Sequence, residues 1–316
     1  MSRIDLGFAQ RRGDDEFHTP AGTAEPMLQR YADRLRGAHV LLNTNDGDTS
    51  AFWTILCERF TQWGLRSLTS LRFDPSADTL FADADGGGRV FRYDGRHVSC
   101  EPTGDAGGFD SPSGLRELTA ADVVVGNPPF SRLKDYVPRL VASRTGFLII
   151  ANPMCLAYRS VFPLFRAGLL RCTGGNGGLW FRHPSGDVDA CATRRDVDGC
   201  QLVRVSPCGW LTNLPGPMEG DVFDPEPGDP SMLPLLDDPA VPVADRRALI
   251  PGGHDGMVAA SVGVFTMWPR GWRPVAVSGA EGWPAARVHG RKAYKRILLE
   301  PCPGWVPGMG VPRRAG

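Results

Sequence analysis

The sequence contains little lysine. Lys134, Lys292 and Lys295 are the only lysines among 316 residues, so arginine supplies nearly all of the positive charge. The formal net charge at pH 7 is zero, whereas proteins that bind nucleic acid without regard to sequence are often basic overall. The composition therefore gives no support for a purely electrostatic binder, although a local basic face remains compatible with it. The preference for arginine and the 39 glycines and 28 prolines are typical of a GC-rich coding bias.

The spacing of a zinc site is also missing. The eight cysteines form no C-x-x-C pair, and no His-x-x-x-His pair accompanies them. There is no signal peptide and no apolar run of about 18 residues, the length that a membrane helix needs. We therefore expect a reduced, cytoplasmic protein that binds no metal and does not enter a membrane.

The N-terminal half alternates between predicted strands and helices. Short segments predict strands at residues 39–42, 67–73, 121–126 and 146–150, of which the last two are apolar enough to be buried. Amphipathic segments predict helices at residues 25–36, 50–64 and 131–143. We expect Pro26 in the first turn of the first helix and Ser50 as the cap of the second. Asp94-Gly95 predicts a two-residue hairpin turn. Continuous apolar strands that alternate with helices indicate an α/β fold with a doubly wound, mostly parallel sheet.

The pattern changes beyond about residue 170. Proline and glycine become dense, and the predicted strands are short, for example at residues 201–205 and 275–278. We therefore expect a loose N-terminus at residues 1–13, an α/β domain at residues 14–170 and a loop-rich β module at residues 171–316.

The most informative segment is Asn127-Pro128-Pro129-Phe130, which follows the apolar strand at residues 121–126. In open α/β sheets, ligands bind beyond the carboxyl ends of strands, and Asn127 stands at such an end. Two consecutive prolines fix the backbone and remove two N–H donors, so the carbonyl groups there serve as acceptors.

An asparagine oxygen beside a fixed carbonyl forms a pair of acceptors that suits a planar amino group. Two such hydrogen bonds localise the lone pair on the nitrogen, which could then attack a sulfonium methyl group. Phe130 offers a flat face on which a base taken out of a nucleic-acid double helix could stack. The simpler interpretation of the segment is a proline turn after a core strand.

Several blocks, taken in order, resemble a known family, the adenine-specific DNA methyltransferases typified by the EcoRI modification methylase. The segment at residues 122–131 matches the catalytic block of that family closely. Other blocks that resemble it lie at residues 15–20, 43–52, 108–111, 147–158, 210–214 and 294–298. The resemblance implies a Rossmann-like methyltransferase that uses S-adenosylmethionine and methylates the 6-amino group of a flipped adenine in double-stranded DNA, in a restriction-modification or phage-protection context.

The resemblance also implies roles for individual residues. It assigns catalytic roles to Asn127, Pro128, Pro129 and Phe130. It assigns cofactor binding to Phe17, Thr19, Pro20, Asn43, Asn45, Asp46, Asp48, Ser50, Phe109 and Asp110. The family places an acid before its phenylalanine, whereas Asp110 follows Phe109 here, so either Asp105 or Asp110 could take that role.

A basic cluster lies near the C-terminus, where Lys292, Lys295 and Arg296 flank Tyr294. Such residues could contact DNA phosphates, or they could form a solvated strand edge. We expect double-stranded DNA as the partner and a monomer or weak dimer as the oligomeric state.

Two other functions remain open at this point. Asn-Pro-Pro-aromatic loops also serve enzymes that methylate RNA adenine or a glutamine side-chain amide. A catalytically inactive DNA-binding homologue is the second alternative, because the family's acid before Phe109 is missing.

Overall fold

The computed structural model describes residues 18–44, 47–74, 87–174, 178–182, 193–196, 198–215, 219–280, 282–305 and 307. The predicted site residues Phe17, Asn45 and Asp46 lie outside this part of the chain. The described chain forms two compact units. The first comprises the residues up to Ala151 and the segment Gly178–Ser206, and the second comprises Asn152–Gly177 and Pro207–Pro312.

The first unit is built on a mixed sheet with the strand order β4-β3-β2-β1-β5-β6. Strands β2, β1, β5 and β6 run parallel to one another, whereas β3 and β4 extend the β2 edge in antiparallel fashion. The strands are β1 (His39–Leu42), β2 (Ser67–Arg72), β3 (Arg89–Tyr93), β4 (Val98–Pro102), β5 (Val123–Gly126) and β6 (Gly146–Ala151). The predicted α/β fold with a mostly parallel sheet is confirmed.

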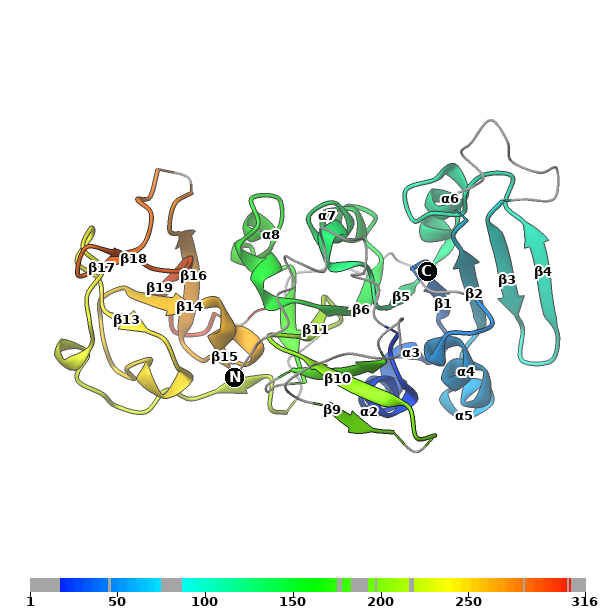
Figure 1. Ribbon diagram of the computed structural model, residues 1–316, viewed down its shortest axis with the longest axis horizontal. Coiled ribbons are helices and arrows are strands. Elements are labelled where there is room, and N and C mark those ends of the chain that lie inside the picture. Colours follow the sequence, from blue (N-terminus) through cyan, green and yellow to red (C-terminus); the bar gives the residue numbers. More distant parts are fainter. Residues whose placement is uncertain are drawn as a thin grey trace. The chain divides into compact units, whose positions relative to one another are not determined.

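Helices cover both faces of this sheet, with α6 and α7 on one side and α2, α4 and α5 on the other (Figure 1). The helices are α2 (Ala21–Arg30), α3 (Ala32–Leu35), α4 (Ala51–Glu58), α5 (Phe60–Trp63), α6 (Pro112–Ala120), the 3-10 turn η2 (Phe130–Arg132) and α7 (Leu133–Ala142). Every residue of β1 and β5 is buried between them. That burial explains why these strands are apolar without interruption.

Local signals set several of the element ends. The Ser50 side chain accepts a hydrogen bond from the Trp53 backbone N–H at 3.3 Å and caps α4, as predicted. Gly64 ends α5 in the left-handed conformation, with φ 65°. Two expectations were wrong. Helix α2 begins at Ala21, so Pro26 lies inside it rather than in its first turn.

The hairpin turn between β3 and β4 is the second difference, because it spans residues 94–97 instead of two residues. The Asp94 carboxylate accepts hydrogen bonds from the backbone N–H groups of Arg96 and His97, at 2.7 and 2.8 Å. These bonds stabilise the longer turn, as aspartate side chains often do.

A second, three-stranded antiparallel sheet belongs to the first unit and has the order β8-β10-β9. Its strands are β8 (Leu179–Arg182), β9 (Thr193–Arg195) and β10 (Gln201–Val205). It is joined to the N-terminal segment, since His18 and Arg182 exchange backbone hydrogen bonds of 3.2 and 2.9 Å. The Thr23 hydroxyl of α2 also donates to the Trp180 carbonyl at 2.7 Å.

The second unit is rich in short strands, which confirms the predicted C-terminal β-rich region. Its centre is a four-stranded sheet with the order β13-β14-β19-β16. The strands are β7 (Arg171–Thr173), β11 (Gly209–Thr212), β12 (Val222–Phe223), β13 (Val243–Ala244), β14 (Val258–Ser261), β15 (Trp268–Pro269), β16 (Trp272–Val277), β17 (Arg287–Val288), β18 (Arg291–Lys292) and β19 (Arg296–Pro301). The helical elements are α8 (Phe162–Arg166) and the 3-10 turns η3 (Pro153–Ala157), η4 (Pro230–Met232), η5 (Arg247–Leu249) and η6 (Val262–Thr266).

A buried ion pair lies in the second unit. The Arg171 and Asp221 side chains are 2% and 0% exposed, and their charged groups lie 3.5 Å apart. Asp221 also accepts a 2.7 Å hydrogen bond from the Thr173 hydroxyl, and Arg171 donates to the Leu214 carbonyl at 2.6 Å. These bonds compensate for the cost of removing both charges from water.

Candidate functional site

The strand order of the first unit defines one place where a ligand fits. Strand β1 connects forward to β2 on one side, while β5 lies on its other side. The chain therefore changes direction between β1 and β5, and a crevice beyond the carboxyl ends of such strands is the usual ligand site of an open α/β sheet. Asn43 directly follows β1 and Asn127 directly follows β5.

A cavity of about 1020 Å³ lies at this position. Its walls include the start of α2, the loop after β1, helix α4 along its length, the end of β2, the segment before α6 and the loop after β5. The predicted site residues that line it are Thr19, Pro20, Asn43, Ser50, Phe109, Asp110, Asn127, Pro128 and Pro129. Segments that are far apart in the sequence thus meet around a single cavity.

The loop after β5 is shaped by its prolines. Pro128 is buried, whereas Asn127 and Pro129 are partly exposed to the cavity. The Pro129 carbonyl accepts a 2.9 Å hydrogen bond from the Arg132 N–H, which closes the turn η2. This carbonyl is therefore committed to the local fold.

Phe130 differs from its neighbours in the loop. Its side chain is only 3% exposed, and it is not among the residues that line the cavity. In this conformation the ring packs in the core beneath the loop, so stacking on a ligand would require it to turn toward the cavity.

Asp110 and Asp105 have different surroundings. The Asp110 carboxylate lies in the cavity wall and forms a 2.7 Å ion pair with Arg132. The Arg132 guanidinium in turn lies over the Phe109 ring, 5.1 Å from its centre. The acid, the aromatic ring and the turn η2 are thereby connected along one wall.

The Asp105 carboxylate is occupied by its own chain. It accepts hydrogen bonds from the Ser113 N–H at 2.8 Å, the Ser113 hydroxyl at 2.5 Å and the Gly107 N–H at 2.8 Å. Burial raises the pKa of Asp105, but these hydrogen bonds together lower it by more, so that its pKa lies below the usual value. Asp105 fixes the segment that leads into α6.

Three polar atoms in the cavity wall stand out. Thr19 Oγ1, Asn43 Nδ2 and Thr44 Oγ1 are buried and have no hydrogen-bond partner among the described residues. The residues that carry them line the cavity. Because a buried polar atom without a partner is costly, these atoms indicate where a polar ligand would bind.

Two predicted site residues in the loop after β1 serve the fold. Asp48 is not among the cavity-lining residues and forms an ion pair with Arg72 of β2. Ser50 does line the cavity, while its hydroxyl caps α4.

Sequence reasoning missed several lining residues, and some carried no signal that could have revealed them. His18, Thr44 and Arg132 are adjacent to predicted residues, so a wider window around each motif would have included them. Arg182 of β8 and Asp198, which lies between β9 and β10, are distant in sequence from the predicted residues and form a 2.5 Å ion pair. Nothing in their local sequence connects them to the cavity.

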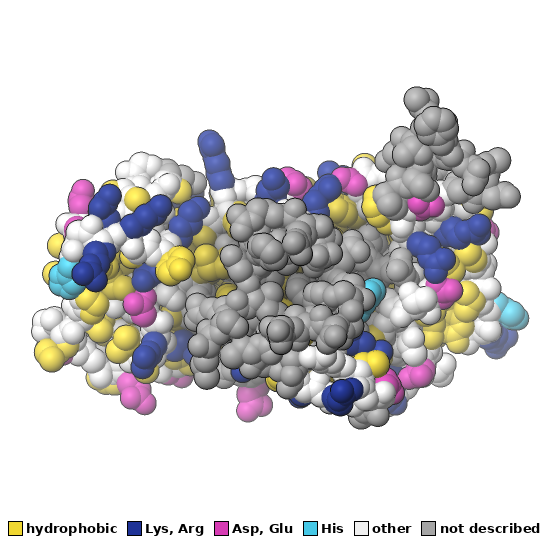
Figure 2. All heavy atoms as spheres, viewed as in Figure 1, with side chains coloured by type: hydrophobic (Ala, Val, Ile, Leu, Met, Phe, Trp, Pro, Cys, Tyr) yellow, Lys and Arg dark blue, Asp and Glu magenta, His cyan; other side chains and the backbone are white. Residues whose placement is uncertain are grey.

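The residues of the predicted basic cluster, which lies in the second unit, differ in their exposure. Lys292 and Lys295 are exposed, and Tyr294 between them is 84% exposed. Arg296 is only 7% exposed and forms a 2.7 Å ion pair with Asp245. Lysine and arginine side chains gather near the edge that holds β17 and β18 (Figure 2).

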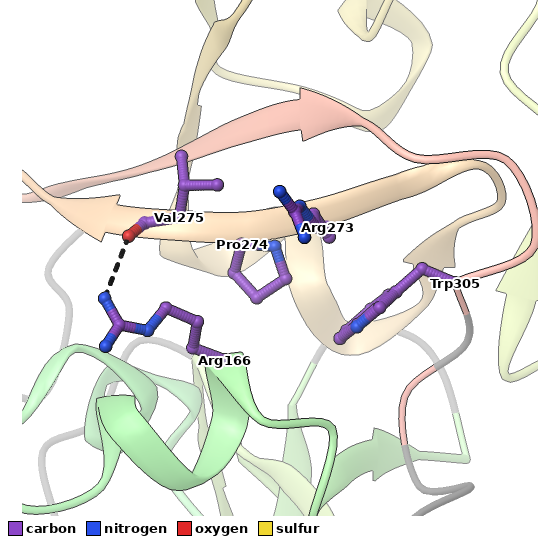
Figure 3. A pocket seen from close by; sticks show the side chains of 5 residues that line it. All are labelled: Arg166, Arg273, Pro274, Val275 and Trp305. Atoms are coloured by element: carbon purple, nitrogen blue, oxygen red, sulfur yellow. Dashed lines mark hydrogen bonds between the residues drawn. The ribbon is translucent and has the colours of Figure 1, made fainter.

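A smaller cavity of about 320 Å³ lies in the second unit, where Arg166, Arg273 and Trp305 face it (Figure 3). Arg166 donates a 3.4 Å hydrogen bond to the Val275 carbonyl, and Arg273 forms an ion pair with Glu300. No predicted site residue lines this cavity.

The described residues give no sign of a metal centre or a membrane span. Among them, no three His, Cys, Asp or Glu side chains gather in a way that could hold a metal ion. No helix in this part of the chain has the length and apolar character to cross a bilayer.

Comparison with known proteins shows the family to which the chain belongs. The sequence model of a family described as adenine-specific methyltransferase EcoRI matches residues 5–219. The chain is 30% identical to the Type II methyltransferase M.MpnI of Mycoplasma pneumoniae over 219 residues, which cover 65% of this chain and 63% of the relative. It is 28% identical to the Type II methyltransferase M.EcoRI of Escherichia coli over 222 residues, which cover 66% and 68% of the two chains.

A further relative is the Type II methyltransferase M.MgeORF184P of Mycoplasma genitalium, at 23% identity with 66% and 64% coverage. The chain thus spans about two thirds of the length of the curated relatives that it matches. The family match ends before the basic cluster and the block at residues 294–298. No solved structure matches the chain.

Proposed function

Because the chain belongs to the adenine-specific methyltransferase EcoRI family, we propose that it transfers a methyl group from S-adenosylmethionine to the 6-amino group of adenine in double-stranded DNA. The relatives are named Type II methyltransferases, and this supports a role in restriction and modification.

One observation carries the proposal. Asn127, Pro128 and Pro129 share a single cavity with Thr19, Asn43 and Phe109, which the family resemblance connects with the cofactor. Its volume of about 1020 Å³ is at the upper end of small-molecule sites, which typically measure about 300–1,000 Å³. A cavity of this size has room for a nucleoside cofactor together with a base.

The wall of the cavity suits S-adenosylmethionine, which supplies an electrophilic methyl group when it is bound. Its amino-acid and ribose portions carry several polar atoms, and Thr19 Oγ1, Asn43 Nδ2 and Thr44 Oγ1 would bind them. Phe109 contributes an apolar surface to the same cavity. Of the two candidate acids, we assign the cofactor role to Asp110, because it lines the cavity and Asp105 does not.

The loop after β5 would hold the target amino group. The Asn127 side-chain oxygen and the Pro128 carbonyl are the acceptors that we assign to its two hydrogens, since the Pro129 carbonyl already binds the Arg132 N–H. The two prolines restrict the backbone that carries the Pro128 carbonyl. Hydrogen bonds to both acceptors would strengthen as positive charge develops on the nitrogen, which favours the transition state over the ground state.

Adenine cannot reach this cavity while it is stacked in a duplex, so the base would have to leave the helix. Lys292 and Lys295, exposed in the second unit, are candidates for phosphate contacts that hold the DNA during this step.

The test uses the purified protein, unmethylated genomic DNA and S-adenosylmethionine with a labelled methyl group. We expect calorimetry to detect cofactor binding and mass spectrometry of the digested DNA to find labelled N6-methyladenine. Parallel reactions contain RNA or a glutamine-containing protein fragment. Label in either of those substrates but not in DNA would overturn the assignment of DNA, and cofactor binding without any transfer would identify an inactive homologue.

A further inference from the structure

A buried hydrogen bond joins the loop after β1 to the helix that follows the Asn-Pro-Pro segment. The Tyr136 hydroxyl of α7 lies 2.5 Å from Oδ1 of Asn43. The Tyr136 side chain is 1% exposed and Asn43 is 4% exposed. Asn43 lines the large cavity, whereas Tyr136 does not.

We propose that Tyr136 is a positioning residue, which orients the Asn43 amide so that its NH2 group donates a hydrogen bond to an acceptor atom of bound S-adenosylmethionine. The inference rests on the proposed function, because it assumes that this cofactor occupies the cavity.

The chemistry of the pair fixes the orientation. A phenol hydroxyl donates readily to an amide oxygen, and the amide nitrogen cannot accept a hydrogen bond in return. Burial raises the pKa of Tyr136 far above its usual value, so its hydroxyl stays protonated and remains a donor. With Oδ1 held by Tyr136, the NH2 group is the part of the amide that is left for the cavity.

That NH2 group is buried and has no hydrogen-bond partner among the described residues. Leaving such a donor unsatisfied is unfavourable, so an acceptor on a ligand would remove the cost. Thr44 Oγ1 and Thr19 Oγ1, which are also buried without a partner in this part of the chain, provide further polar atoms in the same wall.

The Tyr136 ring is itself held in place. The edge of its ring packs against Phe109, with ring centres 4.8 Å apart and planes inclined by 76°. The Arg132 guanidinium covers the Phe109 ring and pairs with Asp110. The Tyr136 hydroxyl therefore has little freedom to move. A positioning residue needs this, because it must itself be held in place by its surroundings.

The first test is Tyr136→Phe, which removes only the hydroxyl. Loss of one buried hydrogen bond should weaken S-adenosylmethionine binding about 3- to 10-fold in calorimetry. The KM for the cofactor should rise while kcat at saturating cofactor stays unchanged. Tyr31→Phe is the matched control, because Tyr31 is fully buried in the same unit and does not line the cavity. Its cofactor affinity should equal that of the wild type.

A double-mutant cycle shows whether Tyr136 acts through Asn43. In an Asn43→Ala background, Tyr136→Phe should cause no further loss of cofactor affinity. A loss of equal size in both backgrounds would overturn the proposal. Melting curves for every variant identify those that fail to fold.

Asn43→Asp tests the direction of the bond. A carboxylate still accepts from Tyr136 but cannot donate, so its cofactor affinity should fall at least as far as that of Asn43→Ala. Wild-type affinity in Asn43→Asp would show that an oxygen faces the cofactor, and it would refute the assigned orientation. If the wild type does not bind S-adenosylmethionine, the proposed function fails. If the wild type binds it and Tyr136→Phe binds it equally well, only the positioning role of Tyr136 is refuted.

Discussion

The Tyr136 hydroxyl donates a 2.5 Å hydrogen bond to Asn43, although 93 residues separate the two in the sequence. Asn43 follows the first strand of the parallel sheet, and Tyr136 lies on the helix behind the Asn-Pro-Pro loop. The loop after β1 and helix α7 therefore share a buried contact. A substitution in α7 can affect the cavity-lining Asn43 without touching a ligand.

Asn127→Ala should abolish methyl transfer and largely spare cofactor binding. The Asn127 oxygen is one of the two acceptors that we assign to the target amino group, and its contribution is made mainly in the transition state. Transfer can be measured with labelled cofactor, and cofactor affinity by calorimetry. Turnover close to that of the wild type would contradict the assigned role.

Asp110→Asn and Asp105→Asn should have different effects. Asp110→Asn removes the charge that pairs with Arg132 in the cavity wall, so we expect weaker cofactor binding at nearly unchanged stability. Asp105→Asn should lower the melting temperature and leave the cofactor affinity of the folded protein intact, because its carboxylate binds Gly107 and Ser113, which do not line the cavity. The opposite result would move the cofactor role to Asp105.

The effect of Asp105→Asn on the melting temperature should depend on pH in a definite direction. The folded-state pKa of Asp105 is lowered, so its ionised form stabilises the folded protein above its unfolded pKa of about 4. This contribution is lost as the pH falls through the folded-state pKa. The difference in melting temperature between wild type and Asp105→Asn should therefore shrink in acid.

Phe130→Ala separates a core role from a stacking role. Because Phe130 is 3% exposed, we expect truncation to cost about 3–5 kcal/mol of stability, as is usual for a buried phenylalanine. Melting curves test this, while the fluorescence of 2-aminopurine at the target position reports base flipping. Unchanged melting with a lost fluorescence signal would instead support stacking on the base, which is worth about 1–3 kcal/mol.

The variant with Lys292→Ala and Lys295→Ala should bind DNA of every sequence more weakly. If each lysine contacts one phosphate, the slope of log affinity against log salt should fall by roughly 2 in total. Lys134→Ala is a matched control on the first unit, and its slope should not change. Arg296→Ala should reduce stability instead, because Arg296 is buried against Asp245. An unchanged slope in the double variant would refute the phosphate contacts.

Much of the fold could be predicted because its signals are local. The apolar runs of β1, β5 and β6 and the cap at Ser50 each depend on a few neighbouring residues. The Asn-Pro-Pro loop also carries its own signal, since prolines after a buried strand fix the backbone wherever the strand lies.

The rest depends on contacts between distant segments. No periodicity pairs Tyr136 with Asn43, and none predicts that Arg182 lines the cavity. Asp105 and Asp110 have equal status in the sequence, and they differ only through the hydrogen bonds that their positions in space allow. The stacking role of Phe130 was predicted from its aromatic side chain. Its burial, in contrast, depends on how the turn η2 directs that side chain.

The order of segments along the chain limits where this protein can be cut and joined to a fragment of a relative. The first compact unit takes up residues 178–206 after the chain has already entered the second, and these residues bind back to His18 and Thr23. A fragment cut near residue 170 would lose the β8-β10-β9 sheet. A graft that keeps the first unit whole therefore needs junctions near residues 151, 178 and 206, and a single junction near residue 170 would divide that unit.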